Sequence, residues 1–223
     1  VKFIRSASYW AIKSQGYVWF DNSWNFFDEN WKSQDTCCWS SYTAANGGAV
    51  FSGDPTNTKD LDGRACQMID LYLDKLQEQG VRYAVWNILA YNRIPFEDAD
   101  VLATLQYGEN PEEGKLYEPS RAQMVFPLQG AYLSKYIAYI DVQKRKLVYV
   151  DANLYGNVSS AERNGSVLEA VMPAYLEYLD SLPSVYDLFK NAPVGEMPIV
   201  YSDKDINIFS DKAFVFKKEN ANN

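Results

Sequence analysis

The first part of the chain alternates between strand-like apolar runs and turn residues. An Asn-Gly-Gly turn at residues 46–48 separates the last two of these runs. Residues 1–15 have mixed periodicity and fit either a short helix or an edge strand. The polar residues 21–23 lie between the first two predicted strands or within them. The predicted strands are residues 17–20, 24–28, 36–42 and 49–51.

The first apolar pattern with helical spacing follows these strands. Apolar residues recur at this spacing over residues 65–79, and Gly80 suits a helix end, so the pattern predicts a helix. Residues 81–91 (VRYAVWNILAY) form a nearly continuous apolar run, which is typical of a buried central strand. A short helical pattern opens at residues 95–98 and is predicted to end near Gly108, before a charged loop at residues 110–114.

The remaining pattern predicts a hairpin followed by helices. Residues 136–142 and 147–151 flank a short basic turn, and residues 122–128 form a further strand. A helix capped by Ser159 or Ser160 is predicted to run to about Leu182, with Pro173 as a kink or a new start. A short helix should cover residues 183–190. Short β-like runs follow at residues 199–201, 206–209 and 213–216.

This order of elements predicts a mainly β chain of the α+β class. About seven or eight strands that do not alternate regularly with helices favour a β-sandwich over a doubly wound sheet. We expect residues 1–158 to form the sandwich. Residues 159–223 should add a helical segment and an appendage packed on the same body.

Composition narrows the function classes. Of the 223 residues, 47% are hydrophobic, so a packed core is available. Aromatic residues make up 15%, which favours a β-rich fold and would also suit a sugar-binding surface. The net charge of −8 argues against nucleic acid as a ligand, and it favours cations or a basic protein partner.

The chain contains no histidine and three cysteines. Serine and cysteine catalysis that depends on histidine is therefore excluded, as are histidine-ligated zinc sites. Cys37, Cys38 and Cys66 are a poor disulfide framework and are expected to be small buried residues. With no apolar run long enough to span a membrane, we expect a cytoplasmic protein. Because the chain starts at Val1, we also leave open that it is part of a longer protein.

Small oxygen-bearing side chains are densest between residues 21 and 71. Gly53 and Gly63 lie among them, on segments bounded by strand-like runs. Such loops suit Ca²⁺, which takes about 6–8 oxygen ligands in irregular geometry. The alternative is that these residues only mark solvated turns. The cluster comprises Asp21, Asn22, Ser23, Asn25, Asp28, Asp54, Asn57, Asp60 and Asp62.

An EF-hand does not account for this cluster. With Gly63 as the invariant glycine, Thr58 would occupy the first ligand position and Ile69 the twelfth. Neither residue can serve, since the loop needs a carboxylate at both.

Three segments follow one another through the cluster: DNSWNFFD at residues 21–28, GAVFSGD at residues 48–54 and IDL at residues 69–71. Together they resemble the TerD family of tellurium-resistance and stress-response proteins. Family members carry a DxSAFLLD-like segment, then GxVVHSGD, an acidic Gly/Asp loop and V-D-L. The resemblance covers about residues 15–155, and later strands of the family fall at residues 84–91 and 136–151.

The resemblance implies a non-enzymatic β-sandwich that binds Ca²⁺ between loops. The family is associated with tellurite, phage and colicin resistance and with stress-response complexes that associate with membranes through their partners. Carried onto this chain, the implied ligands are Asp21, Asp54, Asp60 and Asp62. Asn57 and Asp28 are weaker candidates. Calcium would then order loops used for assembly.

The chain departs from the family pattern in the acidic loop. Residues 59–64 read KDLDGR, with two acids where the family has three or four, and with Lys59 and Arg64 beside them. Fewer carboxylates should weaken calcium binding. The helix predicted over residues 65–79 is a second departure, since the family has a strand there.

Two other functions remain open. A metal-independent protein-interaction domain would explain the acids and glycines as turn residues. A glycoside hydrolase, or a sugar-binding module, would use Asp28 or Glu29 together with Asp54 as a carboxylate pair. A cysteine nucleophile is weaker, because Cys37 and Cys38 have no histidine partner.

Overall fold

The computed structural model describes residues 1–11, 18–53, 64–109, 122–153, 160–184, 187, 199–202 and 214–217. The chain divides into two compact units, Val1–Met172 and Pro173–Asn223. The boundary lies within a helix, whereas the sequence pattern places it after Val158.

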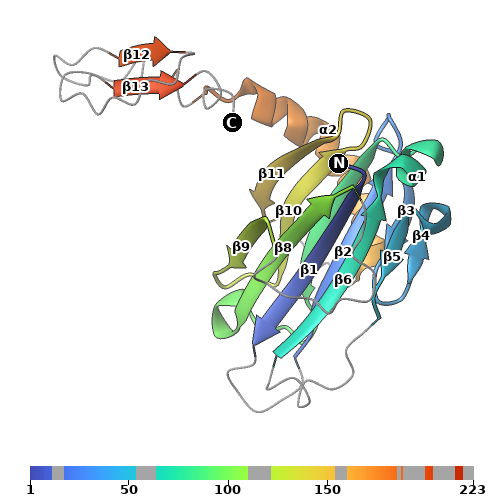
Figure 1. The fold of residues 1–223 in the computed structure, drawn as a ribbon. Helices are drawn as coiled ribbons and strands as arrows, with labels where there is room; N and C mark the ends of the chain where they lie inside the picture. Colours follow the sequence, from blue (N-terminus) through green and yellow to red (C-terminus); the bar gives the residue numbers. More distant parts are fainter. Residues whose placement is uncertain are drawn as a thin grey trace. The chain divides into compact units, whose positions relative to one another are not determined.

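Two antiparallel sheets form a sandwich-like body in the first unit (Figure 1). The first is six-stranded, in the order β4-β5-β6-β1-β8-β9, and the second is five-stranded, in the order β11-β10-β7-β2-β3. The first contains β1 (Phe3–Ala11), β4 (Thr43–Ala44), β5 (Ala49–Phe51), β6 (Arg64–Tyr72), β8 (Asp100–Gly108) and β9 (Met124–Leu128). The second contains β2 (Phe20–Phe27), β3 (Ser33–Cys37), β7 (Tyr83–Ala90), β10 (Ser134–Asp141) and β11 (Lys146–Ala152).

The mainly β prediction is confirmed. The core lies between the sheets, where the fully buried rings of Trp24 and Trp86 stack 5.7 Å apart. Trp10 contacts Phe20 edge-on across the same layer. These rings come from β1, β2 and β7, so aromatic burial holds the two sheets together.

The strand predicted at residues 36–42 lies earlier in the chain, because β3 is Ser33–Cys37 and residues 38–41 form a turn closed by a Cys38–Ser41 bridge. Three further predictions differ from the structure because of strand pairing. The described part of the segment predicted as a short helix or an edge strand is residues 1–11, and it forms the inner strand β1, which lies between β6 and β8 in the sheet. The predicted helix at residues 65–79 is the strand β6 followed by the short helix α1 (Leu73–Glu78). The helical pattern at residue 95 gives one 3-10 turn, Phe96–Asp98, and then β8. In each case pairing with β1 or with β8 overrides the local periodicity.

Other predictions are confirmed. The apolar run at residues 81–91 gives β7, a central strand between β10 and β2. β10 and β11 form the expected hairpin. The turn at residues 46–48 is a 3-10 turn, Ala45–Gly47, with Gly47 at φ +82°. One prediction in this region is corrected: the two strands expected at residues 17–20 and 24–28 are the single strand β2 (Phe20–Phe27), which includes the polar residues 21–23. Residue 17 lies outside the described residues.

Helix α2 (Ala161–Ser181) matches the long predicted helix and runs through Pro173 without a break. Its first part covers the outer face of the five-stranded sheet, where Asn25 Nδ2 donates to Ala161 O over 3.0 Å. In the second unit, β12 (Ile199–Ser202) and β13 (Phe214–Lys217) pair in parallel. The predicted strand at residues 206–209 and the loop at residues 110–114 lie outside the described residues, as does most of the predicted helix at 183–190. No helix in the described part of the chain is long and apolar enough to cross a membrane.

Candidate functional site

Asp21 lies near one end of the sandwich, which we call the Asp21 end. At this end β1 finishes at Ala11 and β6 begins at Arg64, directly opposite in the sheet register. Trp10 reaches Val18 from β1 with a 2.9 Å hydrogen bond to the backbone carbonyl. The segment between β5 and β6 carries the predicted acidic loop, and its described ends are Gly53 and Arg64. Asp21 lies near the start of β6, because its carboxylate contacts Gln67 of that strand.

The carboxylate of Asp21 is almost fully buried, with 4% of the residue exposed. It accepts a 3.2 Å hydrogen bond from Gln67 Nε2, which comes from β6 in the other sheet. A buried carboxylate is costly unless hydrogen bonds or a cation compensate it.

Gln67 reaches Asp21 because β3 is short. β3 pairs with β2 only from Trp24 to Phe27, so β3 leaves the backbone of Asn22 without a strand partner on that side. Gln67 Oε1 accepts the Asn22 N–H at 2.8 Å instead. A single glutamine therefore completes the edge of one sheet and positions the Asp21 carboxylate.

A buried polar network fixes this arrangement from the core side. Asn22 Nδ2 donates to Ser6 O and to Gln67 O, at 3.3 and 3.2 Å. Its Oδ1 accepts the indole N–H of Trp86 at 2.7 Å. Ser6 Oγ in turn accepts the indole N–H of Trp24 at 2.8 Å. Since every member is buried and bonded, the network holds β2 rigidly beside β6.

The predicted calcium ligands are only partly visible in the structure. Four of them fall outside the described residues: Asp54, Asn57, Asp60 and Asp62. Within the described residues, no group of three or more His, Cys, Asp or Glu side chains lies close enough to hold a metal ion. The described chain thus offers Asp21 as one carboxylate of a site that needs about 6–8 oxygens.

The structure does not bring Asp28 to Asp21. Asp28 follows the last residue of β2, so a full strand of roughly 20 Å separates the two carboxylates. Asp28 Oδ1 accepts the backbone N–H groups of Asn30 and Lys32, both at 2.8 Å. Asp28 therefore closes the turn between β2 and β3 and does not share a calcium site with Asp21.

The geometry gives little support to catalysis by the candidate residues. Burial raises the pKa of the Cys37, Cys38 and Cys66 thiols, which disfavours the reactive thiolate. The carboxylate pair considered for glycoside hydrolysis needs Asp54, which lies outside the described residues. Its other members, Asp28 and Glu29, lie at the far end of β2 from Asp21.

The sequence reasoning missed Gln67 as a site residue because it assigned residues 65–79 to a helix. A strand signal was present, since the buried residues Ala65, Ile69 and Leu71 alternate with Met68 and Asp70. Trp39 and Tyr91 are two further residues that no sequence motif marks as part of a site. Their rings meet edge-on at 6.4 Å and are 39% and 57% exposed. Tyr91 lies at the Asp21 end, where its N–H donates to Trp19 O.

Comparison of the sequence with family models and with curated proteins finds no match.

Proposed function

We propose that this chain is a non-enzymatic, TerD-like binding domain that holds Ca²⁺ at the Asp21 end. The observation that carries the proposal is the buried Asp21 carboxylate, which lies beside β6 near the described ends of the acidic segment. Asp21 would bind the ion together with Asp54, Asp60 and Asp62, with Asn57 as a weaker ligand. The bound ion would neutralise these carboxylates and order the segment between β5 and β6.

The arrangement of the strands supports the resemblance. The TerD pattern expects a strand after the acidic loop, and β6 occupies this position. The sequence pattern had predicted a helix there, so one of the two departures from the family pattern is removed. The other departure, the reduced number of acids at residues 59–64, remains.

The role in the cell follows only from the resemblance. We propose that the domain acts in a cytoplasmic stress-response assembly of the tellurite-resistance type, with protein partners through which it reaches membranes. The exposed Trp39 and Tyr91 at the Asp21 end suit such a partner, because aromatic side chains are enriched at interfaces. The same pair would serve a metal-independent interaction domain, which is the second candidate function.

Thermal unfolding in the presence of Ca²⁺ or EGTA tests the proposal. Calcium that binds only the native state should raise stability by about 2.7 kcal/mol at roughly 100 times its Kd. For a chain of this size this corresponds to a rise in Tm of roughly 5–10 °C. Asp21→Asn and Asp54→Asn should each abolish most of this rise.

Asp28→Asn is the matched control, because the amide oxygen can still close the turn after β2. The rise in Tm that Ca²⁺ causes in this variant should equal the rise in the unmodified chain. If Ca²⁺ does not change the Tm of the unmodified chain, the acidic residues are ordinary turn residues that bind no calcium. The second candidate function, a metal-independent interaction domain, then replaces the proposal.

A further inference from the structure

The two sheets of the sandwich end side by side in the edge strands β9 and β11, which we call the open edge (Figure 1). The ring of Phe126 from β9 stacks on that of Tyr149 from β11, with the ring centroids 4.9 Å apart. Phe126 also meets Trp86 edge-on at 6.3 Å, and Trp86 stacks on the fully buried Trp24. The aromatic layer of the core therefore continues without a break to the open edge, where Tyr149 is 51% exposed.

The opposite side of the sandwich, where β3 and β4 are the edge strands, is more polar. β3 carries the polar residues Ser33–Thr36, and the last residue of the strand, Cys37, is buried. Native sheets commonly protect their edge strands with polar or charged side chains. At the open edge, by contrast, Met124, Val125 and Tyr149 are large apolar residues that remain exposed. An exposed apolar edge of this kind favours pairing with another strand.

Of the two strands, β11 has the backbone that suits such pairing. β9 contains Pro127, which has no N–H to donate. β11 contains no proline, and its register against β10 is regular from Lys146 to Tyr149, before a bulge. The N–H and C=O groups of alternate residues in an edge strand point away from the sheet. The outer side of β11 can therefore pair with one further antiparallel strand.

The charges of the open edge favour a second copy of the same chain. The chain as a whole has a net charge of −8, which makes copies repel one another. The charged residues of β9 and β11 are Lys146 and Asp151, which have opposite signs. Asp151 also pairs with Lys135 over 2.5 Å. Two copies can therefore approach through this edge without bringing like charges into excess.

The side-chain order of β11 suits antiparallel pairing with its own copy. Leu147 and Tyr149 are two residues apart, so they point to the same face of the sheet, which is the face that Phe126 covers. Val148 lies between them and points to the other face. A two-fold axis at Val148 would place Leu147 opposite Tyr149 of the partner subunit, and it would leave the bulge near Asp151 outside the paired segment.

We propose that the open edge is the interface of a homodimer, in which β11 pairs antiparallel with its own copy across a two-fold axis at Val148. The five-stranded sheets of the two subunits then form one ten-stranded sheet. The same axis turns the β9 strands toward each other, so the exposed apolar residues of both strands are covered. This interface is independent of the proposed calcium site.

The size of the open edge predicts a weak dimer. β11 has seven residues. A strip about 23 Å long and about 20 Å wide, which is two sheet layers, presents on the order of 450 Å². Stable interfaces bury about 800 Å² per partner, so this dimer should dissociate reversibly, with a Kd of roughly 10–100 μM.

Sedimentation equilibrium of the full chain tests this proposal, at protein concentrations from about 1 to about 300 μM, which bracket the expected Kd. We expect a monomer–dimer equilibrium. Val148→Lys places two like charges beside each other at the axis and should raise the Kd at least about tenfold. Val50→Lys makes the same change at an exposed residue of β5, on the far side of the six-stranded sheet, and should leave the Kd unchanged.

A cross-linking measurement decides the test if the lysine variant does not fold. Val148→Cys places two thiols beside each other at the axis, within reach of a disulfide. Oxidised glutathione, which takes up the two electrons and two protons, should then convert this variant into covalent dimers. Val50→Cys should remain monomeric under the same treatment. A chain that is monomeric at every concentration, an equal loss in Val50→Lys, or equal cross-linking of both cysteine variants would overturn the proposal.

Discussion

Buried polar side chains attach helix α2 to the five-stranded sheet. Asn164 on α2 accepts the Tyr136 hydroxyl at 2.9 Å and donates to Asn87 Oδ1 at 2.9 Å. Burial raises the pKa of Tyr136 to about 12, so this hydroxyl stays protonated and donates at neutral pH. Asn87 in turn donates to Ser134 Oγ and to Lys135 O. The buried side chains of Asn164, Tyr136 and Asn87 therefore satisfy one another's hydrogen-bonding groups away from solvent.

Replacing Asn164 should test this network directly. Asn164→Leu removes the acceptor of the buried Tyr136 hydroxyl, and it leaves the buried side-chain oxygen of Asn87 with only a 3.5 Å hydrogen bond from Ser23 Oγ. We expect a loss of roughly 1–3 kcal/mol in the free energy of unfolding, measured by urea denaturation. Ser166→Ala, two residues further along α2 and exposed, should change it by less than about 0.5 kcal/mol. A stability equal to that of the unmodified chain would show that the network contributes nothing.

At the scale of elements, α2 depends on close contact as well as on hydrogen bonds. A Cβ atom at Gly165 would lie 2.5 Å from Ser33 Oγ, so the glycine permits α2 to approach β3 closely. Glu169 accepts Lys32 Nζ at 2.6 Å and the Ser33 N–H at 2.9 Å. The hydrogen bond from Lys32, followed by that from Ser33, lowers the pKa of Glu169.

This lowered pKa gives the docking of α2 a defined pH dependence. The Glu169 contribution is fully present above the unfolded-state pKa of about 4.3, and it is lost as the pH falls through the lower pKa of the folded state. Glu169→Gln should therefore lower the Tm at pH 7 relative to the unmodified chain, and this difference should disappear once the pH falls below the folded-state pKa of Glu169. The exposed α2 residue Glu177 provides the control variant Glu177→Gln, which should show no such pH-dependent difference. A Glu169→Gln effect on the Tm that stays the same size as the pH is lowered would contradict the assignment.

The strand β6 illustrates how an element can carry a misleading pattern. Its sequence continues into α1, so Met68, Ile69, Tyr72, Leu73 and Leu76 fall at helical spacing although they belong to two elements. β6 pairs with β1 over its whole length and with β5 over Ile69–Leu71. The backbone hydrogen bonds of two neighbouring strands outweigh a helix preference of a few tenths of a kcal/mol per residue.

At the scale of the whole molecule, both sheets and the core cluster lie within Val1–Met172. This unit contains the described aromatic layer and the part of α2 that covers the five-stranded sheet. The sandwich should therefore not depend on the rest of the chain for its stability.

A shortened chain of residues 1–172 checks this directly. We expect it to unfold in one cooperative transition with a Tm within roughly 5 °C of the full chain, because it contains the whole described core cluster. The measurement is circular dichroism against temperature, with the full chain as reference. A broad transition, or loss of the β signal, would show that residues 173–223 are needed for the sandwich to fold.

The sequence by itself determined the elements whose burial is uniform or whose turns are local. The apolar run that became β7, the hairpin of β10 and β11, the turn at residues 46–48 and the helix α2 follow from side-chain pattern and turn chemistry. The sequence also identified Asp21 as a candidate ligand, because short acids next to glycines and strands are a local signal.

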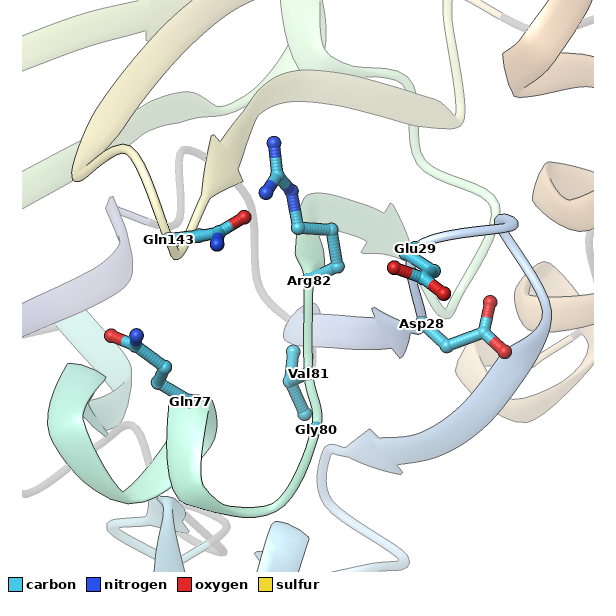
Figure 2. Close-up of a pocket in the computed structure, with 7 residues that line it drawn as sticks. All are labelled: Asp28, Glu29, Gln77, Gly80, Val81, Arg82 and Gln143. Carbon is cyan, nitrogen blue, oxygen red and sulfur yellow. The ribbon is translucent and has the colours of Figure 1, made fainter.

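Only the tertiary structure decided which residues meet. It placed Asp28 at the far end of β2, where Asp28 lines a pocket together with Arg82 and Gln77 that no sequence motif marks (Figure 2). It also placed Gln67 beside Asp21, through a contact between residues 46 positions apart in the chain. Such contacts depend on strand order and register, which long-range pairing sets and which no local window of the sequence contains.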